Sequence, residues 1–321
     1  MNDWGTAYLY VLKYDNVTGV RDVDELPVFI GASEPHMSGV FDTSRELRGK
    51  AAVVTGAGRR GGLGEAIVRR LARGGSHVVL SDIGAPVDAA TPASMVGARS
   101  EMRVLADEIA AAHGVRVLPF ECDVRESRRM DELAQFAQKE LGSLDIWVNN
   151  AGIGYIMKPF LEVAPGDWRA VIDVNLTGCF NGVQSAARIM TAQGNGGRIV
   201  NIASQAAKSG FPFAAAYCSS KHGLVGLVRS VAIELGQFGI TVNNVCPNHV
   251  TTGLGAWQND YFSKKLGLSL DEYLAKMRDR IPLRRCGLPE DTANAVAFLC
   301  SEAAGYITAE SLNVSGGEEP H

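Results

Sequence analysis

One stretch near residue 50 constrains the fold more than any other, because it sets a strand, a turn, a helix and a second strand in a fixed order. Ala51–Thr55 is a compact apolar run, as expected for a parallel strand buried on both faces. The chain continues with the glycine-rich turn Gly56–Gly64, the helical pattern Ala66–Ala72 and a second apolar run, His77–Ser81, ending at Asp82. The glycines let a backbone approach a pyrophosphate, and the free N–H groups at the start of the helix can bind it. The stretch therefore predicts a dinucleotide-binding unit.

Strands and helices continue to alternate downstream of this unit. Five further apolar strand runs lie at 115–122, 144–148, 198–203, 240–246 and 311–314. Helical patterns lie at 101–112, 126–141, 167–192, 215–238 and 289–300. The alternation predicts a doubly wound α/β fold, with a parallel sheet of about seven strands covered by helices on both faces. We expect residues 1–48 to form an N-terminal arm, with short strands at Tyr8–Leu12 and Leu26–Ile30, and residues 49–321 a single catalytic domain with a substrate lid at about 251–287.

The composition argues against several classes of protein. The chain is 46% apolar and 21% charged, which is ordinary for a globular enzyme with a sizeable core. Its net charge of −4, without a basic block, argues against a nucleic-acid partner. The six cysteines are scattered and form no C-x-x-C pair, which argues against a zinc site or a disulfide framework and favours the cytoplasm. No apolar run approaches the roughly 18 residues of a membrane span, and the N-terminus lacks a secretory pattern.

A tyrosine and a lysine four residues apart predict the chemistry. Tyr217 and Lys221 begin a helical pattern, and their spacing places the phenol and the ammonium on one helical face. A lysine charge close to a phenol favours the phenolate, so we expect the pKa of Tyr217 to fall from about 10 toward neutrality. Such a tyrosine can give or take a proton at a hydroxyl or carbonyl oxygen, and Ser204 can hydrogen-bond the same oxygen. An isolated Tyr-x-x-x-Lys spacing is more often a chance pair on a solvated helix. Here the spacing follows a dinucleotide-binding unit, which favours the catalytic interpretation.

Four ordered motifs resemble those of the short-chain dehydrogenase/reductase family, in its single-domain branch, over about Gly49 to Gly317. They are the turn Thr55–Gly64, the N-N-A-G of Asn149–Gly152, a serine thirteen residues before the tyrosine, and the Tyr-x-x-x-Lys pair. The resemblance implies a catalytic tetrad of Asn175, Ser204, Tyr217 and Lys221. In that tetrad Tyr217 is the acid/base, and Lys221 lowers its pKa and binds the nicotinamide ribose. Ser204 holds the substrate oxygen, and Asn175 anchors a water that relays protons from Lys221.

The resemblance also implies a nicotinamide dinucleotide cofactor and no metal. The implied cofactor contacts are Gly56, Arg59, Arg60, Gly62, Leu63, Gly64, Asp82, Ile83, Asp123, Val124, Asn150, Ala151, Gly152, Tyr217, Lys221, Pro247, Val250 and Thr252. The carboxylate of Asp82 can accept hydrogen bonds from both ribose hydroxyls and repels a 2′-phosphate, which favours NAD over NADP. Arg59 and Arg60 are the opposing signal, because they can attract that phosphate; alternatively they lie on an exposed loop or contact the pyrophosphate.

Three departures from the family pattern stand out. The turn holds five residues, 57–61, where the family has three, so we expect it to bulge over the phosphates. Asn248 and His249 follow Pro247, where the family usually has glycine, and they bring polar side chains near the nicotinamide end. His249 is either a substrate ligand or, more readily, a loop histidine satisfied by backbone. The arm and the Ala-, Pro- and Gly-rich loop 84–97 are longer than the family needs, and we expect that loop to lie on the surface.

Aromatic residues suggest the substrate class. Three lie in the lid, two on the loop between Ser204 and Tyr217, and one after N-N-A-G: Trp257, Tyr261, Phe262, Phe211, Phe213 and Tyr155. They favour an apolar or aromatic substrate, or simple core packing. The resulting hypothesis is an NAD-dependent alcohol dehydrogenase or carbonyl reductase acting on a secondary alcohol and its ketone. The alternatives are an epimerase or dehydratase of the family's longer branch, whose Gly58-x-x-Gly61-x-x-Gly64 turn superficially fits, and a non-enzymatic nucleotide-sensing scaffold.

Two helices have wider apolar faces than a core-facing stripe needs, which predicts self-association. The residues concerned are Ala186, Ala187, Ile189, Leu224, Leu227, Val228, Val231 and Ala232. The resemblance implies an interface at these helices and a second one near the last strand and Gly316-Gly317. Two different isologous interfaces generate a homotetramer.

Overall fold

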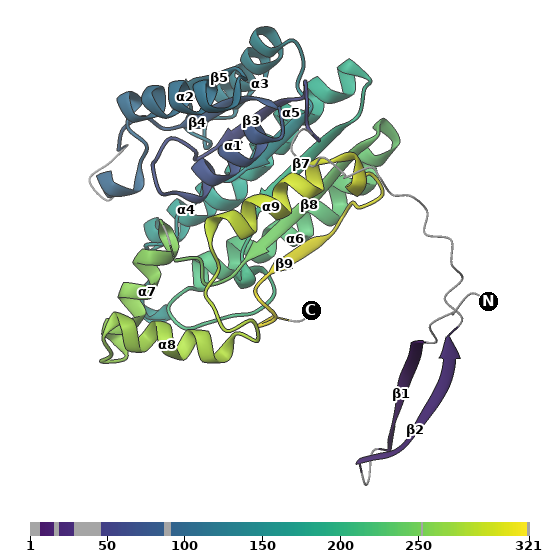
Figure 1. Cartoon of the computed structure of the whole chain (residues 1–321). Coiled ribbons are helices and arrows are strands. Elements are labelled where there is room, and N and C mark those ends of the chain that lie inside the picture. The colour runs from purple at the N-terminus through teal and green to yellow at the C-terminus, as the bar shows by residue number, and fades with distance from the viewer. Residues whose placement is uncertain (1–6, 16–18, 29–45, 87–90, 252, 320–321) are drawn as a thin grey trace, which may run out of the picture. The chain divides into compact units, whose positions relative to one another are not determined.

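The computed structural model of the chain describes residues 7–15, 19–28, 46–86, 91–251 and 253–319 (Figure 1). Its contacts divide the chain into two units, Met1–Asp42 and Thr43–His321, and each is described by itself. The first unit contains an antiparallel hairpin of β1 (Ala7–Asp15) and β2 (Gly19–Val28). The predicted strand Tyr8–Leu12 lies inside β1. The predicted strand Leu26–Ile30 overlaps only the end of β2, and residues 29–30 lie outside the described part of the chain.

The second unit is built on a seven-stranded parallel sheet, which confirms the predicted fold class. Its strands are β3 (Ala51–Thr55), β4 (His77–Asp82), β5 (Val117–Glu121), β6 (Ile146–Asn149), β7 (Gly197–Ile202), β8 (Ile240–Pro247) and β9 (Ser311–Val314). Their order across the sheet is β5-β4-β3-β6-β7-β8-β9, so the chain moves outward from β3 in one direction and then from β6 in the other. The loops after β3 and β6 therefore diverge, and they leave a crevice at the carboxyl ends of the strands.

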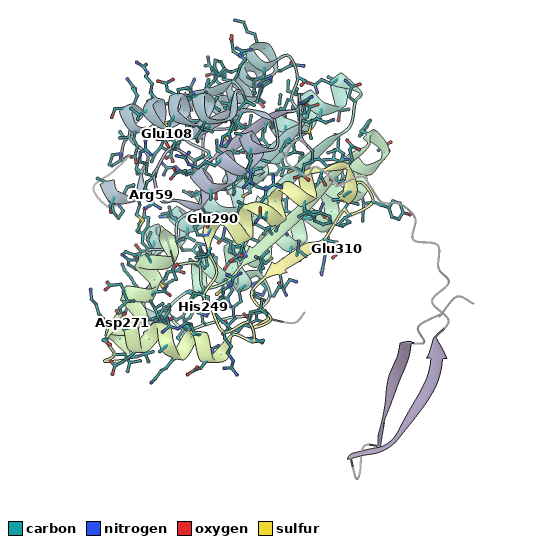
Figure 2. All side chains as sticks on the ribbon, viewed as in Figure 1. Arg59, Glu108, His249, Asp271, Glu290 and Glu310 are labelled. Atoms are coloured by element: carbon teal, nitrogen blue, oxygen red, sulfur yellow. The ribbon has the colours of Figure 1, made fainter. Side chains whose placement is uncertain are left out.

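Six helices cover the two faces of the sheet. One face packs against α1 (Leu63–Arg73), α2 (Arg99–His113) and α9 (Pro289–Cys300). The other packs against α3 (Ser127–Leu141), α5 (Gly178–Gln193) and α6 (Ala215–Leu235). Neighbouring strand residues alternate between the two cores, as Val53 and Val54 do on β3. Charged residues such as Glu108 of α2 and Glu290 of α9 are exposed (Figure 2).

The lid region and the loops contribute shorter elements. Residues predicted to form a partly helical lid contain α7 (Leu254–Lys265) and α8 (Leu270–Arg280). Short 3₁₀ helices lie at Ala93–Met95, Phe160–Glu162, Gln205–Ala207, Gly236–Phe238 and Glu302–Ala304. Within the described residues, no helix combines the length and the apolar character that a membrane crossing requires.

The predicted helix 167–192 differs from the observed one in an informative way. It begins at α4 (Pro165–Ile172), passes through a π-helical turn at Asp173–Thr177 and continues as α5. A π turn accommodates one extra residue, and such turns are frequent at functional sites. This one contains Asn175, a member of the predicted tetrad, which is fully buried.

A ladder of polar side chains joins four neighbouring strands of the sheet. Asn149, Asn201, Asn244 and Ser311 occupy facing positions on β6 to β9. The amide of Asn149 donates to the amide oxygen of Asn201 at 2.8 Å, Asn201 donates to Asn244 at 3.2 Å, and Asn244 donates to the hydroxyl of Ser311 at 3.0 Å. These buried bonds fix the register of the strands that lead into the site.

Candidate active site

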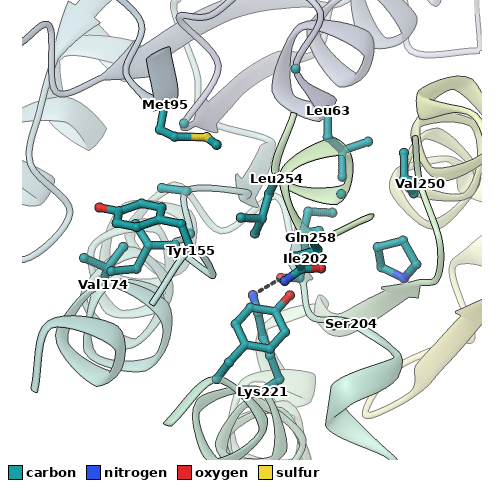
Figure 3. Close-up of a pocket in the computed structure, with 18 of the residues that line it drawn as sticks. Leu63, Met95, Tyr155, Val174, Ile202, Ser204, Lys221, Val250, Leu254 and Gln258 are labelled. Carbon is teal, nitrogen blue, oxygen red and sulfur yellow. Dashed lines mark hydrogen bonds between the residues drawn. The ribbon is translucent and has the colours of Figure 1, made fainter. Parts of the chain in front are cut away.

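A cavity of about 710 Å³ opens at the carboxyl ends of the strands. Figure 3 shows Lys221 and Ser204 on one side of it and Leu63 and Met95 on the opposite side. Most of the residues predicted from the sequence line this one cavity: Gly56, Arg59, Gly62, Leu63, Gly64, Asp82, Ile83, Asp123, Val124, Asn150, Ala151, Gly152, Ser204, Tyr217, Lys221, Pro247 and Val250. Arg60 and Asn175 do not line it, and Thr252 lies outside the described residues.

The N-N-A-G motif, at the end of β6, is hydrogen-bonded to the end of β3, where the strand order reverses. The side-chain amide of Asn150 donates to the carbonyl oxygens of Thr55 and Gly56, at 2.9 and 2.8 Å. In return, the hydroxyl of Thr55 accepts from the backbone N–H groups of Asn150 and Ala151. Gly56 has a φ of +63°, and a Cβ there would lie 2.6 Å from Ala151 Cα. The turn therefore needs glycine for both its conformation and this close approach.

Three of the predicted catalytic residues meet at one wall of the cavity. Tyr217 lies in the first turn of α6, and its phenol is hydrogen-bonded to the side chain of Ser204. The backbone of Ser204 is fully extended, and its hydroxyl also accepts from the N–H of Ala206 at 3.1 Å. Lys221 is buried one turn further along α6. Its Nζ donates to the carbonyl oxygen of Ile202 at 2.8 Å and lies 5.7 Å from the centre of the Tyr217 ring (Figure 3).

The protonation of this pair differs from the sequence-based expectation. We expected Lys221 to lower the pKa of Tyr217, but burial raises that pKa to about 12, and the hydrogen bond from Ser204 offsets only part of the rise. Burial also lowers the pKa of Lys221. The physical reason is that a low-dielectric wall disfavours both charged forms, while the lysine is directed at a carbonyl and not at the phenolic oxygen. The phenol is therefore the proton-bearing form at neutral pH.

Asn175 lies behind the wall of the cavity and connects two segments. Its amide oxygen accepts from the N–H of Ile153 at 2.8 Å. Its amide nitrogen donates to the carbonyl of Ile153 at 2.9 Å and to the hydroxyl of Ser220 at 3.1 Å. The Asn175 side chain thus connects the loop after β6 to Ser220 of α6, the residue before Lys221. The water relay implied for Asn175 stays a prediction.

Comparison with known proteins identifies the family. Residues 56–319 match a family model described as enoyl-(acyl carrier protein) reductase. A 3-oxoacyl-[acyl-carrier-protein] reductase of Aquifex aeolicus is 36% identical, over 85% of this chain and 98% of the relative. The chain belongs to the short-chain dehydrogenase/reductase family. It is an oxidoreductase of this family.

Two solved structures of the family share the fold closely. Carveol dehydrogenase of Mycobacterium avium, in complex with NAD, has a TM-score of 0.78 and 30% identity, over 86% of this chain and 99% of that one. An actinorhodin polyketide ketoreductase variant with NADPH has a TM-score of 0.75 and 33% identity, over 85% of this chain and 98% of that one. The two proteins thus bind different nicotinamide cofactors on the same fold.

The two arginines of the glycine turn point in different directions. Arg59 lines the cavity, and its Nη1 donates to the carbonyl of Ser94 at 3.2 Å. Arg60 is exposed and points away: its Nη2 lies 2.6 Å from Glu108, and its N–H donates to Glu101. The predicted cofactor contact at Arg60 is therefore not supported, because the carboxylates of α2 hold that side chain outside the cavity.

Asp82 supports the glycine turn as well as facing the cavity. Its carboxylate accepts from the N–H groups of Gly58 at 3.0 Å, of Ile83 at 2.9 Å and of Gly97. Burial raises its pKa, and these N–H groups partly offset the rise. A Cβ on Gly97 would lie 2.3 Å from the carbonyl carbon of Gly58. The end of the loop 84–97 therefore packs directly onto the turn, although the sequence indicated only a surface insertion.

Several cavity residues were not predicted. They come from the loop 84–97 and from α7 and α8: Thr91, Met95, Val96, Leu254, Gln258, Tyr273, Met277 and Arg280. The sequence carried a signal for three of these residues. Tyr273, Met277 and Arg280 are four and then three residues apart, which puts them on one face of a helix.

The predicted aromatic residues divide into two groups. Phe211, Phe213, Phe262 and Tyr155 line the cavity. Trp257 and Tyr261 do not line it, and instead stack on each other with ring centres 5.3 Å apart. Their contribution is to the packing of the lid. In the described residues, no group of three or more His, Cys, Asp or Glu side chains is placed to hold a metal ion.

Proposed function

We propose that this protein interconverts a secondary alcohol and its ketone with a nicotinamide dinucleotide, preferentially NAD, and that Tyr217 is the acid/base. One observation carries the proposal: the cavity that is bordered by the glycine turn and Asp82 is also bordered by Ser204, Tyr217 and Lys221. A dinucleotide-binding crevice is thus continuous with a proton donor. The assignment of the catalytic and cofactor-binding roles is part of the proposal.

The protonation of the site sets how its side chains act. In reduction, the phenol of Tyr217, already protonated at neutral pH, donates its proton to the carbonyl oxygen of the substrate. The hydroxyl of Ser204, hydrogen-bonded to the same phenol, holds that oxygen. In oxidation the phenol must first lose its proton, and Lys221 is the cation nearest to stabilise the phenolate. Both groups are buried in the wall of the cavity.

The residues of the crevice fit a bound dinucleotide. Gly62, the residue before α1, provides no side-chain cap, so the first N–H groups of the helix are available to a pyrophosphate. Asp82 presents a carboxylate for ribose hydroxyls, and Arg59 is the cation on the same wall. When bound, the nicotinamide would donate a hydride to the substrate carbon in reduction and accept one from it in oxidation. We infer a preference for NAD because the charge of Asp82 disfavours a 2′-phosphate.

The substrate end of the cavity supports an apolar or aromatic substrate. Phe211 and Phe262 lie there with ring centres 5.9 Å apart, and Leu254 adds an aliphatic surface. Apolar walls with a few placed polar groups are usual for pockets that bind small organic molecules. We also infer a homotetramer, and a cytoplasmic location because all six cysteines are unpaired.

A screen of secondary alcohols and ketones tests the function. Aromatic, terpenoid, steroid and polyol substrates would be supplied with NAD or NADP and followed at the absorbance of the reduced nicotinamide. We expect turnover with at least one class, faster with NAD. Cofactor binding without turnover of any compound would favour the scaffold alternative. A product isomerised or dehydrated without net redox change would favour the epimerase or dehydratase alternative.

A further inference from the structure

A buried carboxylate with polar partners lies beside the cavity, where three segments meet. His249 of the loop after β8 and Arg280 of α8 both line the cavity. Glu318, which follows β9, contacts both: its Oε2 is 3.2 Å from His249 Nε2, and its Oε1 is 2.8 Å from Arg280 Nη2. The side chain of Glu318 is only 6% exposed. A carboxylate buried to this extent requires partners, and here these partners include two residues of the cavity wall.

Contacts of its carboxylate and of the preceding backbone fix the position of Glu318. The amide of Asn248 donates to its Oε2 at 2.6 Å. Upstream, the carbonyl of Gly316 accepts from the N–H of Leu283, in the loop that follows α8, at 3.1 Å. Gly316 has a φ of +64°, and a Cβ there would lie 2.6 Å from Ile281. The segment 315–319 is therefore packed tightly against the end of the lid, so the carboxylate position is fixed.

Glu318 determines which nitrogen of His249 carries the proton. Burial lowers the pKa of His249, so the neutral imidazole is favoured near pH 7. A neutral imidazole has one N–H, and the carboxylate facing Nε2 places that hydrogen on Nε2. Nδ1 is then a hydrogen-bond acceptor, and the structure gives it no partner among the described residues. The sequence suggested a histidine satisfied by backbone, whereas its partner is this carboxylate.

The backbone of His249 also points to a ligand. Its φ is +43°, in the left-handed region that non-glycine residues seldom occupy. Such conformations cost on the order of 1–3 kcal/mol and are concentrated at ligand-binding positions. Here the conformation holds an imidazole at the wall of the cavity.

We propose that Nδ1 of His249 accepts a hydrogen bond from a second hydroxyl group of the substrate, which makes secondary alcohols with another hydroxyl on an apolar body the preferred class. This inference rests on the proposed function. A carboxylate in place of that hydroxyl is disfavoured at Nδ1, because it has no hydrogen to donate and an acceptor nitrogen would repel it. A neutral hydroxyl, in contrast, supplies the hydrogen that the imidazole lacks.

Matched substrates test the preference directly. The rates of cyclohexanol oxidation would be compared with those of the 1,2-, 1,3- and 1,4-cyclohexanediols and their monomethyl ethers, with 2-butanol and 2,3-butanediol as the acyclic pair. We expect kcat/KM to be higher for at least one diol than for its parent alcohol. The corresponding ether should lose the preference, because it has no hydrogen to donate. If Arg280 were the contact, the ether would keep it.

Variants then assign the preference to His249. His249→Phe keeps a ring but removes the acceptor, so we expect the diol-to-alcohol ratio of kcat/KM to fall about tenfold. Glu318→Gln should lower the ratio less, because a glutamine orients the imidazole less strictly. Glu310→Gln, the same change at an exposed position after α9 (Figure 2), is the control and should leave the ratio unchanged.

The outcomes distinguish failure of this inference from failure of the proposed function. Melting temperatures would show whether the variants are folded. If His249→Phe does not fold, Glu318→Gln still tests the inference. A wild type that turns over the parent alcohols without preferring any diol overturns the inference and leaves the proposed function intact. A preference that survives in both variants overturns it as well. A protein that turns over no alcohol or ketone of any class contradicts the proposed function itself.

Discussion

At the residue scale, the wall around Tyr217 disfavours charge unless a partner is present. Burial raises the pKa of Tyr217 to about 12 and lowers that of Lys221, so the wall disfavours the charged form of each group. Ser204 is the side chain that already contacts the phenol. The site in this state is arranged to donate a proton, and the phenolate that oxidation requires depends on stabilisation by Lys221.

Removing the phenolic oxygen should stop catalysis without emptying the cofactor crevice. For Tyr217→Phe we expect turnover to fall by about 10²- to 10⁴-fold, the usual contribution of a general acid or base. NAD binding, measured by calorimetry, should stay within a few-fold, because the ring and Lys221 remain. Tyr306→Phe, at a fully exposed tyrosine, is the matched control. Wild-type rates in the Tyr217 variant would remove this residue from the mechanism.

The charge of Asp82 should set the cofactor preference. Asp82→Asn keeps an oxygen for the N–H of Gly58 but loses the repulsion of a 2′-phosphate, so we expect the kcat/KM ratio of NAD to NADP to fall. Adding Arg59→Ala should reverse part of that fall, because it removes the cation at the cavity. Adding Arg60→Ala should not, since Glu108 holds that side chain outside. A wild type that prefers NADP would show that Arg59 outweighs Asp82.

At the element scale, local patterns predicted the parallel strands well, because each is a short apolar run between turn residues. β3 and β9 begin and end where the sequence indicated, and the other strands of that sheet differ by one or two residues. The π turn around Asn175 was not predictable, because it depends on bonds to Ile153 and Ser220 from distant segments. The packing of loop 84–97 on the glycine turn and the contact of Glu318 with His249 are likewise non-local. Local sequence therefore predicted the glycine turn and the catalytic wall of the cavity, but not the parts that loop 84–97, α7 and α8 contribute.

The asparagine ladder should contribute measurably to stability. In Asn201→Ala, Asn149 loses its acceptor and Asn244 loses its donor, and each polar group left unpaired in the core costs about 1–3 kcal/mol. Denaturant unfolding at fixed protein concentration measures the change in the free energy of unfolding. Asn195→Ala, at an exposed position before β7, should change it by less than about 0.5 kcal/mol. Equal effects of the two substitutions would show that the ladder contributes little.

At the scale of the whole molecule, the most exposed apolar residues are not those chosen from the sequence, of which Ala187, Ile189, Leu227 and Val231 are half-buried. Ala186, Leu224, Val228 and Ala232 pack into the core. Other apolar side chains are exposed on the same helices and before them: Phe160, Leu161, Trp168, Phe180 and Ile233. A second set is exposed around α9 and β9: Leu283, Leu288, Phe298, Tyr306 and Leu312. Exposed apolar groups in such numbers commonly mark association surfaces.

We expect these two sets to form two different isologous interfaces and hence a homotetramer. Sedimentation or light scattering at micromolar concentration would measure the mass of the assembly. A buried charge without a partner destabilises an interface strongly, so Phe180→Glu and Phe298→Glu should each reduce the tetramer to a dimer, and the double variant to a monomer. Val104→Glu on α2, outside both sets, is the control and should stay tetrameric. A monomeric wild type would contradict the prediction. A dimeric wild type that only Phe180→Glu dissociates would retain the helix interface and eliminate the one at β9.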